Sequence, residues 1–238
     1  VALVDIGGGT TDVAVYYDDV IRHTAVIPFG GNVVTRDIKE GCAILQRQAE
    51  SLKMQFGSAL GDLAHDDKVV TIPGISGREP KEISFKSLAY IIQSRMEEII
   101  DAIVYEIENS GYMDKLSAGI VLTGGGAMLK NMNQLVKFKT GMDVRIGYPN
   151  ECLVADTPDE INQPMYSTSI GLLLKGMEIY EENQESLNVN NLGQDAEEPV
   201  REEEIVRRKV KDRFKGGRLL EGLKNTLSDI FDESDVKM

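Results

Sequence analysis

Three consecutive glycines near the start of the chain, Gly7, Gly8 and Gly9, restrict its fold more than any other feature of the sequence. The apolar residues 1–6 and 12–17 on either side predict two short strands joined by a tight turn. Glycine loses more backbone entropy on ordering than any other residue, so three in one turn weaken a hairpin unless they serve another purpose. Without side chains in the way, their backbone N–H groups can converge on a bound anion. We therefore interpret this turn as a candidate phosphate-binding loop.

Polar side chains surround this turn. The hydroxyl groups of Thr10 and Thr11 would add hydrogen bonds to a bound phosphate. The carboxylate of Asp5 would repel a bare phosphate, but it fits a Mg²⁺ ion that is held through water between the two groups. A hairpin in which Asp5 and Asp12 only cap the turn is the alternative interpretation.

A second glycine turn follows another apolar segment, in the sequence GIVLTGGGAML of residues 119–129. This sequence predicts a buried strand, a turn at Gly124, Gly125 and Gly126, and then a helix that contains Met128. A flat ligand can lie against such a turn, and the start of a helix favours negative charge. A tight strand–helix turn that needs positive φ angles is the alternative. Because two triple-glycine turns follow two apolar strands, the ligand interpretation is favoured.

The remaining hydrophobic periodicity predicts a mixed α/β fold. Apolar runs predict further strands at residues 20–27, 69–72, 118–123 and 144–146. Helical spacing predicts helices at residues 33–40, 43–56, 85–109, 127–137 and 168–180, and the Pro- and Gly-rich residues 73–80 predict a loop.

Composition excludes several classes of protein. The net charge of −13 argues against a nucleic-acid-binding protein. The two cysteines, Cys42 and Cys152, and the two histidines show no metal-ligand spacing, so neither a disulfide framework nor a zinc site is predicted. No segment reaches the roughly 20 apolar residues of a transmembrane helix. Because a strand begins at once with Val1, we expect the chain to be part of a longer protein.

The end of the chain has a different character. Residues 181–206 are rich in acidic side chains and poor in apolar ones, which predicts a disordered linker. Residues 207–233 combine a cluster of Lys and Arg with an amphipathic pattern, which is typical of a helix that lies on an anionic membrane surface. Docking of this helix on a partner protein, or on the chain itself, is the alternative. Its apolar stripe consists of Leu219, Leu220, Leu223, Leu227, Ile230 and Phe231.

The two glycine turns together resemble the actin-like ATPase superfamily. DIGGGTTD (residues 5–12) matches its second phosphate hairpin, and VLTGGGAML (residues 121–129) matches its adenosine motif. Between them, AESLKMQFGSA (residues 49–59) resembles the helix of the adenine pocket, in which Glu50 and Lys53 would reach the ribose and the base. The resemblance implies ATP and Mg²⁺ as ligands. The implied nucleotide-binding residues are Asp5, Gly7, Gly8, Gly9, Thr10, Thr11, Glu50, Lys53, Gly124, Gly125, Gly126 and Met128.

Four further segments narrow the resemblance to one family. PFGGNVVTRDI (residues 28–38), IPGISGREP (72–80), IIQSRMEEI (91–99) and YSTSIGLLL (166–174) are similar to the bacterial cell-division family FtsA. The resemblance implies the second half of an actin-like, ribonuclease H-like ATPase fold with an inserted α/β subdomain, followed by the linker and the amphipathic helix. The first phosphate loop and half of the ATP cleft would lie upstream, so we expect the chain alone to bind ATP poorly.

The family layout also implies a division of the chain into parts. Residues 1–35 and 118–180 would form the nucleotide-binding subdomain, and residues 36–117 would form the inserted subdomain. Residues 181–206 would be the acidic linker, and residues 207–233 would be the membrane-targeting segment.

The resemblance further implies partners and a place in the cell. The protein would bind ATP, form actin-like filaments, recruit other division proteins and tether the FtsZ ring to the cytoplasmic face of the cell membrane at the division site. ATP would act mainly as a conformational ligand, with at most weak hydrolysis. Arg95 is the candidate contact for the C-terminal peptide of FtsZ, although a solvated charged helix face is the more ordinary interpretation of this residue.

Two other classes of protein stay open on the sequence. A sugar or acyl kinase on the same fold needs a substrate pocket with a catalytic carboxylate, which the motifs do not show, and it gives the acidic linker no role. Another actin-like ATPase, of the MreB, pilus-assembly or chaperone type, would share the glycine turns.

Overall fold

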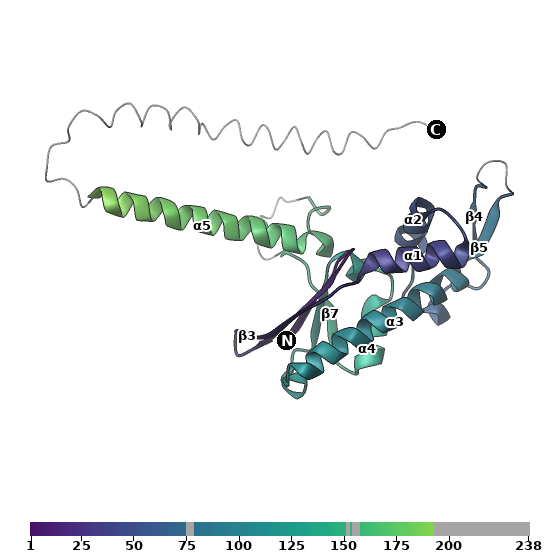
Figure 1. Ribbon diagram of the computed structural model, residues 1–238, viewed down its shortest axis with the longest axis horizontal. Coiled ribbons are helices and arrows are strands. Elements are labelled where there is room, and N and C mark those ends of the chain that lie inside the picture. The colour runs from purple at the N-terminus through teal and green to yellow at the C-terminus, as the bar shows by residue number, and fades with distance from the viewer. Residues whose placement is uncertain (75–78, 151–152, 154–157, 193–238) are drawn as a thin grey trace, which may run out of the picture. The chain divides into compact units, whose positions relative to one another are not determined.

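The computed structural model describes residues 1–74, 79–150, 153 and 158–192. Val1–Tyr180 form one compact unit, and the residues from Glu181 onward belong to a second one. The architecture below is that of the first unit (Figure 1). In the described part of the chain, no helix combines the length and the hydrophobicity that a membrane crossing requires.

A mixed sheet forms the centre of this unit. Its strands are β1 (Ala2–Ile6), β2 (Thr11–Tyr17), β3 (Val20–Ile27), β6 (Ile120–Thr123) and β7 (Val144–Ile146), in the spatial order β3-β2-β1-β6-β7. The pairs β1–β2 and β2–β3 are antiparallel, whereas β1, β6 and β7 run parallel to one another. The two glycine turns therefore follow the carboxyl ends of two adjacent parallel strands, β1 and β6, and meet at one edge of the sheet.

The helices confirm the predicted α/β class. They are α1 (Gly31–Cys42), α2 (Gln46–Phe56), α3 (Phe85–Asn109), α4 (Met132–Thr140) and α5 (Ser167–Leu192), and a separate hairpin consists of β4 (Val69–Ile72) and β5 (Lys81–Ser84).

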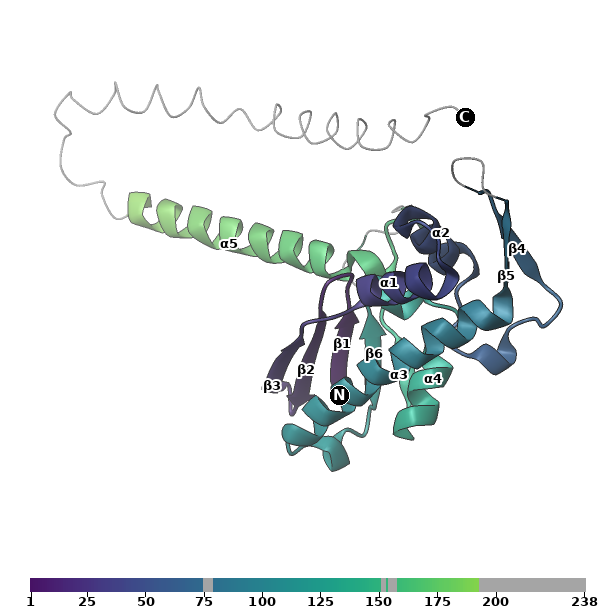
Figure 2. The same cartoon turned by 45° about the vertical axis from the view of Figure 1, so that its right-hand side comes forward.

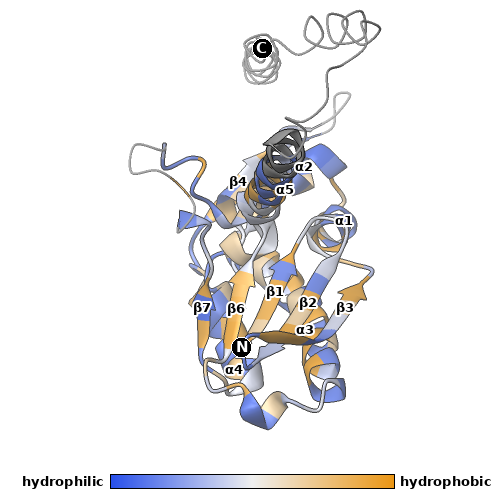
Figure 3. Ribbon diagram, turned by 90° about the vertical axis from the view of Figure 1, so that its left-hand side faces the viewer, coloured by the Kyte–Doolittle hydropathy of each residue, from blue (hydrophilic) through white to orange (hydrophobic). Residues whose placement is uncertain are grey.

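Alternation along β1 gives the sheet two different faces. Val4 and Ile6 are fully buried, whereas Leu3 and Asp5 on the opposite face are only half-buried. Helix α3 lies across the sheet (Figure 2) and packs against β2 and β3. Apolar residues concentrate along β6 and the neighbouring strands (Figure 3). The core thus fixes β1 and β6, and with them the positions of the two turns.

Helix α3 begins at a cap that the sequence supplies. The Ser84 hydroxyl accepts a hydrogen bond from the N–H of Ser87 (3.0 Å), which satisfies one of the unpaired amides of the first turn. The apolar spacing predicted for this helix becomes its buried stripe, which consists of Leu88, Ala89, Ile92, Met96, Ile99, Ile100, Ile103 and Ile107.

Two local predictions differ from the structure. Strand β5 was not predicted, because it is short and buries only Ile83, so its apolar pattern is too weak to indicate a strand until it pairs with β4. The helix predicted at residues 127–137 is also displaced. A short 3₁₀ helix, Gly125–Met128, follows the second glycine turn, and α4 begins only at Met132, after Asn131 with a φ of +63°. The second turn is therefore not followed directly by an α-helix N-terminus.

Helix α5 continues beyond the predicted start of the linker. The acidic linker was predicted from residue 181, but residues 181–192 are helical. The physical reason is that Glu and Gln favour helix even where they cannot build a core, so an acidic segment can extend an exposed helix. The rest of the predicted linker and the predicted membrane-targeting segment lie outside the described residues. The division into residues 1–35 with 118–180 and residues 36–117 stays a prediction.

Candidate functional site

The first glycine turn leaves several backbone amides without acceptors. The turn closes through the N–H of Gly7, which donates to the carbonyl of Thr10 (2.9 Å). The N–H groups of Gly8, Gly9 and Thr10 donate to no protein oxygen within the described residues. All three residues are exposed. Exposed, unpaired amides in one turn are the arrangement that binds an anion.

The carbonyl side of the same turn holds the start of α1. The carbonyls of Gly7 and Gly8 accept hydrogen bonds from the N–H groups of Gly31 (2.9 Å) and Asn32 (2.8 Å). This close approach needs glycine at position 30, because a Cβ on Gly30 would lie 2.4 Å from the Gly7 oxygen. The turn and the first residues of α1 therefore form one hydrogen-bonded unit.

The two threonines of the turn differ in their environment. Thr10 is exposed, and its hydroxyl donates to the carboxylate of Asp12 (3.0 Å). Thr11 is fully buried, and its hydroxyl donates to the carbonyl of Phe29 (3.0 Å). Thr11 thus holds the hairpin against the segment before α1, and Thr10 is the threonine of the turn that a ligand can reach.

The second turn uses its three glycines in different ways. Gly124 has a φ of +81°, and a Cβ there would lie 2.2 Å from Oδ1 of Asp5. A Cβ on Gly126 would lie 2.3 Å from Cγ2 of Ile6, whereas a Cβ on Gly125 would meet no atom within 4 Å. Gly124 and Gly126 are therefore required by packing against the end of β1. The amides of Gly125 and Gly126 find no acceptor in the described part of the chain, which leaves them for a ligand.

Asp5 lies between the two turns. Its Oδ2 accepts a hydrogen bond from the hydroxyl of Thr168 (2.6 Å), in the first turn of α5. No group of three or more His, Cys, Asp or Glu side chains that could hold a metal occurs among the described residues. A direct protein cage for Mg²⁺ is thus not present there, and the water-mediated contact of Asp5 stays a prediction.

Glu50 and Lys53 lie side by side on α2. The two side chains form an ion pair of 2.9 Å. The Lys53 ammonium also donates to the carbonyl of Gly31 (3.0 Å) and to the hydroxyl of Thr35 (2.8 Å), and this hydroxyl contacts Glu50. Burial by itself would raise the pKa of the Glu50 carboxyl, but hydrogen bonds from Thr35 and Lys53 and the charge of Lys53 outweigh it and lower that pKa. Glu50 is therefore ionised at neutral pH.

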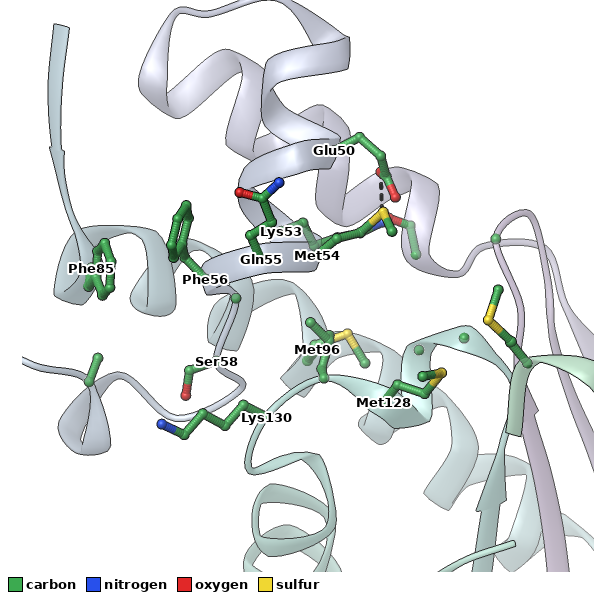
Figure 4. A pocket seen from close by; sticks show the side chains of 18 of the residues that line it. Glu50, Lys53, Met54, Gln55, Phe56, Ser58, Phe85, Met96, Met128 and Lys130 are labelled. Atoms are coloured by element: carbon green, nitrogen blue, oxygen red, sulfur yellow. Dashed lines mark hydrogen bonds and ion pairs between the residues drawn. The ribbon is translucent and has the colours of Figure 1, made fainter. Parts of the chain in front are cut away.

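One pocket of about 580 Å³ brings the predicted segments together (Figure 4). This volume is in the range of small-molecule sites. The predicted residues that line it are Gly7, Gly8, Glu50, Lys53, Gly125, Gly126 and Met128. The predicted residues that belong to the same turns without lining it are Asp5, Gly9, Thr10, Thr11 and Gly124.

Several lining residues were missed by the sequence analysis. Met54, directly after Lys53, lines the pocket from α2 and accompanies the predicted Met128 of the second turn (Figure 4). The rings of Phe56 and Phe85 lie 5.0 Å apart in another part of the wall. An exposed methionine on an otherwise polar helix face was the available signal for Met54, whereas Phe85 reaches the pocket only through the packing of α3.

Arg95 ties two helices together. Its Nε and Nη2 contact the two carboxylate oxygens of Asp37 on α1 (2.5 and 3.3 Å), and its Nη1 contacts Glu98. The hydrogen bond to Asp37 raises the pKa of the Arg95 guanidinium, so the charge is permanent. A contact of Arg95 with a partner peptide stays a prediction.

We expect Arg95→Ala to lower the free energy of unfolding of the chain by about 1–2 kcal/mol, because it leaves the partly buried Asp37 without its charged partner. Urea unfolding followed by circular dichroism measures this change. Arg36→Ala, at an exposed position of α1, is the control and should leave the midpoint unchanged. Equal stability of both variants would show that the ion pair of Arg95 with Asp37 contributes nothing to the free energy of unfolding.

Comparison with known families gives one match that covers most of the chain. The family described as cell division protein FtsA matches residues 2–171. A cell division protein FtsA from Pseudomonas aeruginosa is 37% identical over 199 residues, which are 84% of this chain and 47% of that protein. The Escherichia coli K12 protein of the same description is 38% identical over 185 residues, which are 75% of this chain and 44% of that protein. The chain thus spans less than half the length of these relatives.

Solved structures show the same fold. MreB 5 of Spiroplasma citri bound to AMPPNP aligns with a TM-score of 0.62 and 22% identity, over 78% of this chain and 55% of that one. The same protein bound to ADP aligns with a TM-score of 0.59 and 25% identity, over 77% of this chain and 55% of that one. A MamK double helical filament aligns with a TM-score of 0.51 and 18% identity, over 71% of this chain and 54% of that one. These likenesses establish the actin-like fold.

Proposed function

Because the chain belongs to the FtsA family of cell-division proteins and has an actin-like fold, we propose that it forms one side of an ATP site. The observation that carries this proposal is the convergence of Gly8, Gly125 and Gly126 on one pocket with the carboxylate of Glu50. The amides of these glycines have no protein acceptor in the described residues, so a phosphate chain would satisfy them. The nucleotides in the two MreB 5 crystals support the same use of this fold.

The residues of the pocket suit the parts of a nucleotide. The amides of Gly8, Gly9 and Thr10 would bind phosphate oxygens, and the exposed oxygen of Glu50 would accept hydrogen bonds from the ribose hydroxyls. The thioether side chains of Met54 and Met128 would pack on the base. A bound Mg²⁺ supplies positive charge that offsets the phosphates. Asp5 would hold this ion through water.

The larger role that we propose is that of a scaffold. Family membership favours it over a sugar or acyl kinase and over the MreB, pilus-assembly and chaperone types. The protein would polymerise in actin-like fashion, with at most weak hydrolysis of ATP, and recruit other division proteins. It would hold the C-terminal peptide of FtsZ near Arg95. Residues 207–233 would attach it to the cytoplasmic face of the cell membrane at the division site.

Gly9→Val in the full-length protein tests the nucleotide proposal. A Cβ on Gly9 meets no protein atom within 4 Å, so the fold should tolerate the change. The branched side chain would block the amides of the turn, and we expect the affinity for Mg-ATP to fall at least about tenfold, as when one charge-assisted hydrogen bond is lost. Isothermal titration calorimetry measures the affinity, and thermal unfolding without ligand serves as the control. Gly9→Ala should give an intermediate affinity. Unchanged binding by Gly9→Val would refute the phosphate role of this turn.

A further inference from the structure

The hydroxyl of Thr35 lies at the centre of a buried polar network beside the pocket. Thr35 is 2% exposed, and its Oγ1 lies within hydrogen-bond distance of the Gly31 carbonyl (3.1 Å), the Lys53 ammonium (2.8 Å) and the Glu50 carboxylate. A hydroxyl has one proton and two lone pairs. We assign its proton to Glu50, because the charged carboxylate is a stronger acceptor than the Gly31 carbonyl, and a lone pair accepts from Lys53. The hydroxyl therefore joins the two charges of α2 to α1.

Lys53 is fully engaged by protein atoms. Its ammonium has three N–H groups, and the structure gives it three acceptors: the Gly31 carbonyl (3.0 Å), the Thr35 hydroxyl (2.8 Å) and Glu50 (2.9 Å). The side chain of Lys53 is only 12% exposed. All three N–H groups of Lys53 thus have protein acceptors, and its contact with the ribose or base stays a prediction.

Glu50 lines the pocket, and only one of its carboxylate oxygens is used in contacts with the described residues. All protein contacts of this carboxylate in the described residues use Oε2, and the side chain is 41% exposed. Oε1 is therefore the oxygen available to a ligand. Fixing one oxygen through Thr35 and Lys53 sets the direction of the other, because the carboxylate is planar.

The same network reaches the phosphate turn. The Gly31 carbonyl is held by Lys53, and the Gly31 N–H donates to the carbonyl of Gly7. The path from Glu50 through Lys53 and Gly31 to Gly7 is thus a continuous chain of hydrogen bonds from α2 to the first glycine turn. These hydrogen bonds therefore couple the position of Glu50 to the position of the amides of the first glycine turn.

We propose that Thr35 is a positioning residue for nucleotide recognition, which orients Glu50 toward the ribose hydroxyls and ties α2 to the phosphate turn. This inference rests on the proposed nucleotide function. Thr35 does not line the pocket, so it would act without contacting the nucleotide. Together with Lys53, it would set the distance between the Glu50 carboxylate and the amides of the first glycine turn.

The test compares ATP with 2′,3′-dideoxy-ATP in the full-length protein, both with Mg²⁺, by calorimetry. In the parent protein, ATP should bind about tenfold more tightly, since only ATP offers ribose hydroxyls to the charged acceptor Glu50. In Thr35→Val, which keeps the shape but removes the hydroxyl, this ratio should fall to within about twofold. Thr35→Ser, which keeps the hydroxyl, should retain the parent ratio. Thr140→Val is the control for removing a helical Thr hydroxyl, because Thr140 lies on α4 and does not line the pocket.

Each outcome decides between the two proposals. A parent protein that binds neither nucleotide refutes the proposed function, and the inference falls with it. A parent protein that prefers ATP, together with a Thr35→Val variant that keeps this preference, overturns the role of Thr35 alone. If Thr35→Val does not fold, Thr35→Ala, which also removes the hydroxyl group, is measured in its place. Failure of both to fold, while Thr35→Ser folds, would assign Thr35 to the fold and would also overturn the inference.

Discussion

Gly124→Ala should destabilise the chain by about 2–5 kcal/mol, a large share of the roughly 5–15 kcal/mol that keeps a domain folded. Two effects act together. The φ of +81° is strained for any residue with a Cβ, and that atom would lie 2.2 Å from Oδ1 of Asp5 and 2.6 Å from the carbonyl oxygen of Ile6. The Ile6 carbonyl is backbone at the end of β1 and cannot withdraw without disturbing the strand, whereas the Asp5 side chain could turn away only at the expense of its hydrogen bond from Thr168. Urea unfolding followed by circular dichroism gives the change in free energy.

The adjacent Gly125→Ala is the matched control for this prediction. A Cβ on Gly125 meets no atom within 4 Å, so the stability should stay close to that of the parent chain. Because Gly125 lines the pocket, the added methyl group should weaken Mg-ATP binding in the full-length protein. The pair of variants therefore separates the packing role of the turn from its ligand role. A Gly124→Ala chain as stable as the parent would show that the contact between the second turn and β1 is wrong.

The double change of Leu223 and Leu227 to Glu should reduce binding to anionic vesicles by at least about a hundredfold. The reason lies in the apolar stripe of residues 219–231, where each buried leucine contributes about 1.5–3 kcal/mol and each new carboxylate repels the anionic surface. Co-sedimentation of the chain with vesicles that contain an anionic phospholipid measures the effect, and neutral vesicles show how much of the binding is electrostatic.

A control for charge is needed, because the double change makes the segment more acidic. Lys224→Gln with Asn225→Glu shifts the net charge by the same amount on the predicted polar face. This variant should keep most of the binding, since it leaves the apolar stripe intact. If the leucine variant sediments with vesicles as well as the parent chain does, the stripe does not contact lipid, and the alternative of docking on a protein is favoured.

The parts of the site that the sequence could predict are local. Each glycine turn follows its own strand within a few residues, and Glu50 and Lys53 are one helical turn apart on α2, so short segments were enough to identify them. The helix at residues 85–109 was predicted for the same reason, because hydrophobic periodicity is a property of one segment. The helix after the second turn was misplaced, because a positive φ at Asn131 depends on its surroundings and not on the hydrophobic pattern.

By itself, the sequence determined the α/β class, the two amide-rich turns and the resemblance to the FtsA family, because glycine runs and apolar periodicity act over a few residues. Only the tertiary structure decided how these pieces are used. It placed both turns at one end of adjacent parallel strands, buried Thr11 against Phe29 and turned Lys53 onto Gly31 and Thr35. It also left one oxygen of Glu50 without a partner among the described residues. Such contacts join residues far apart in the chain, and they form only when the sheet and helices pack together.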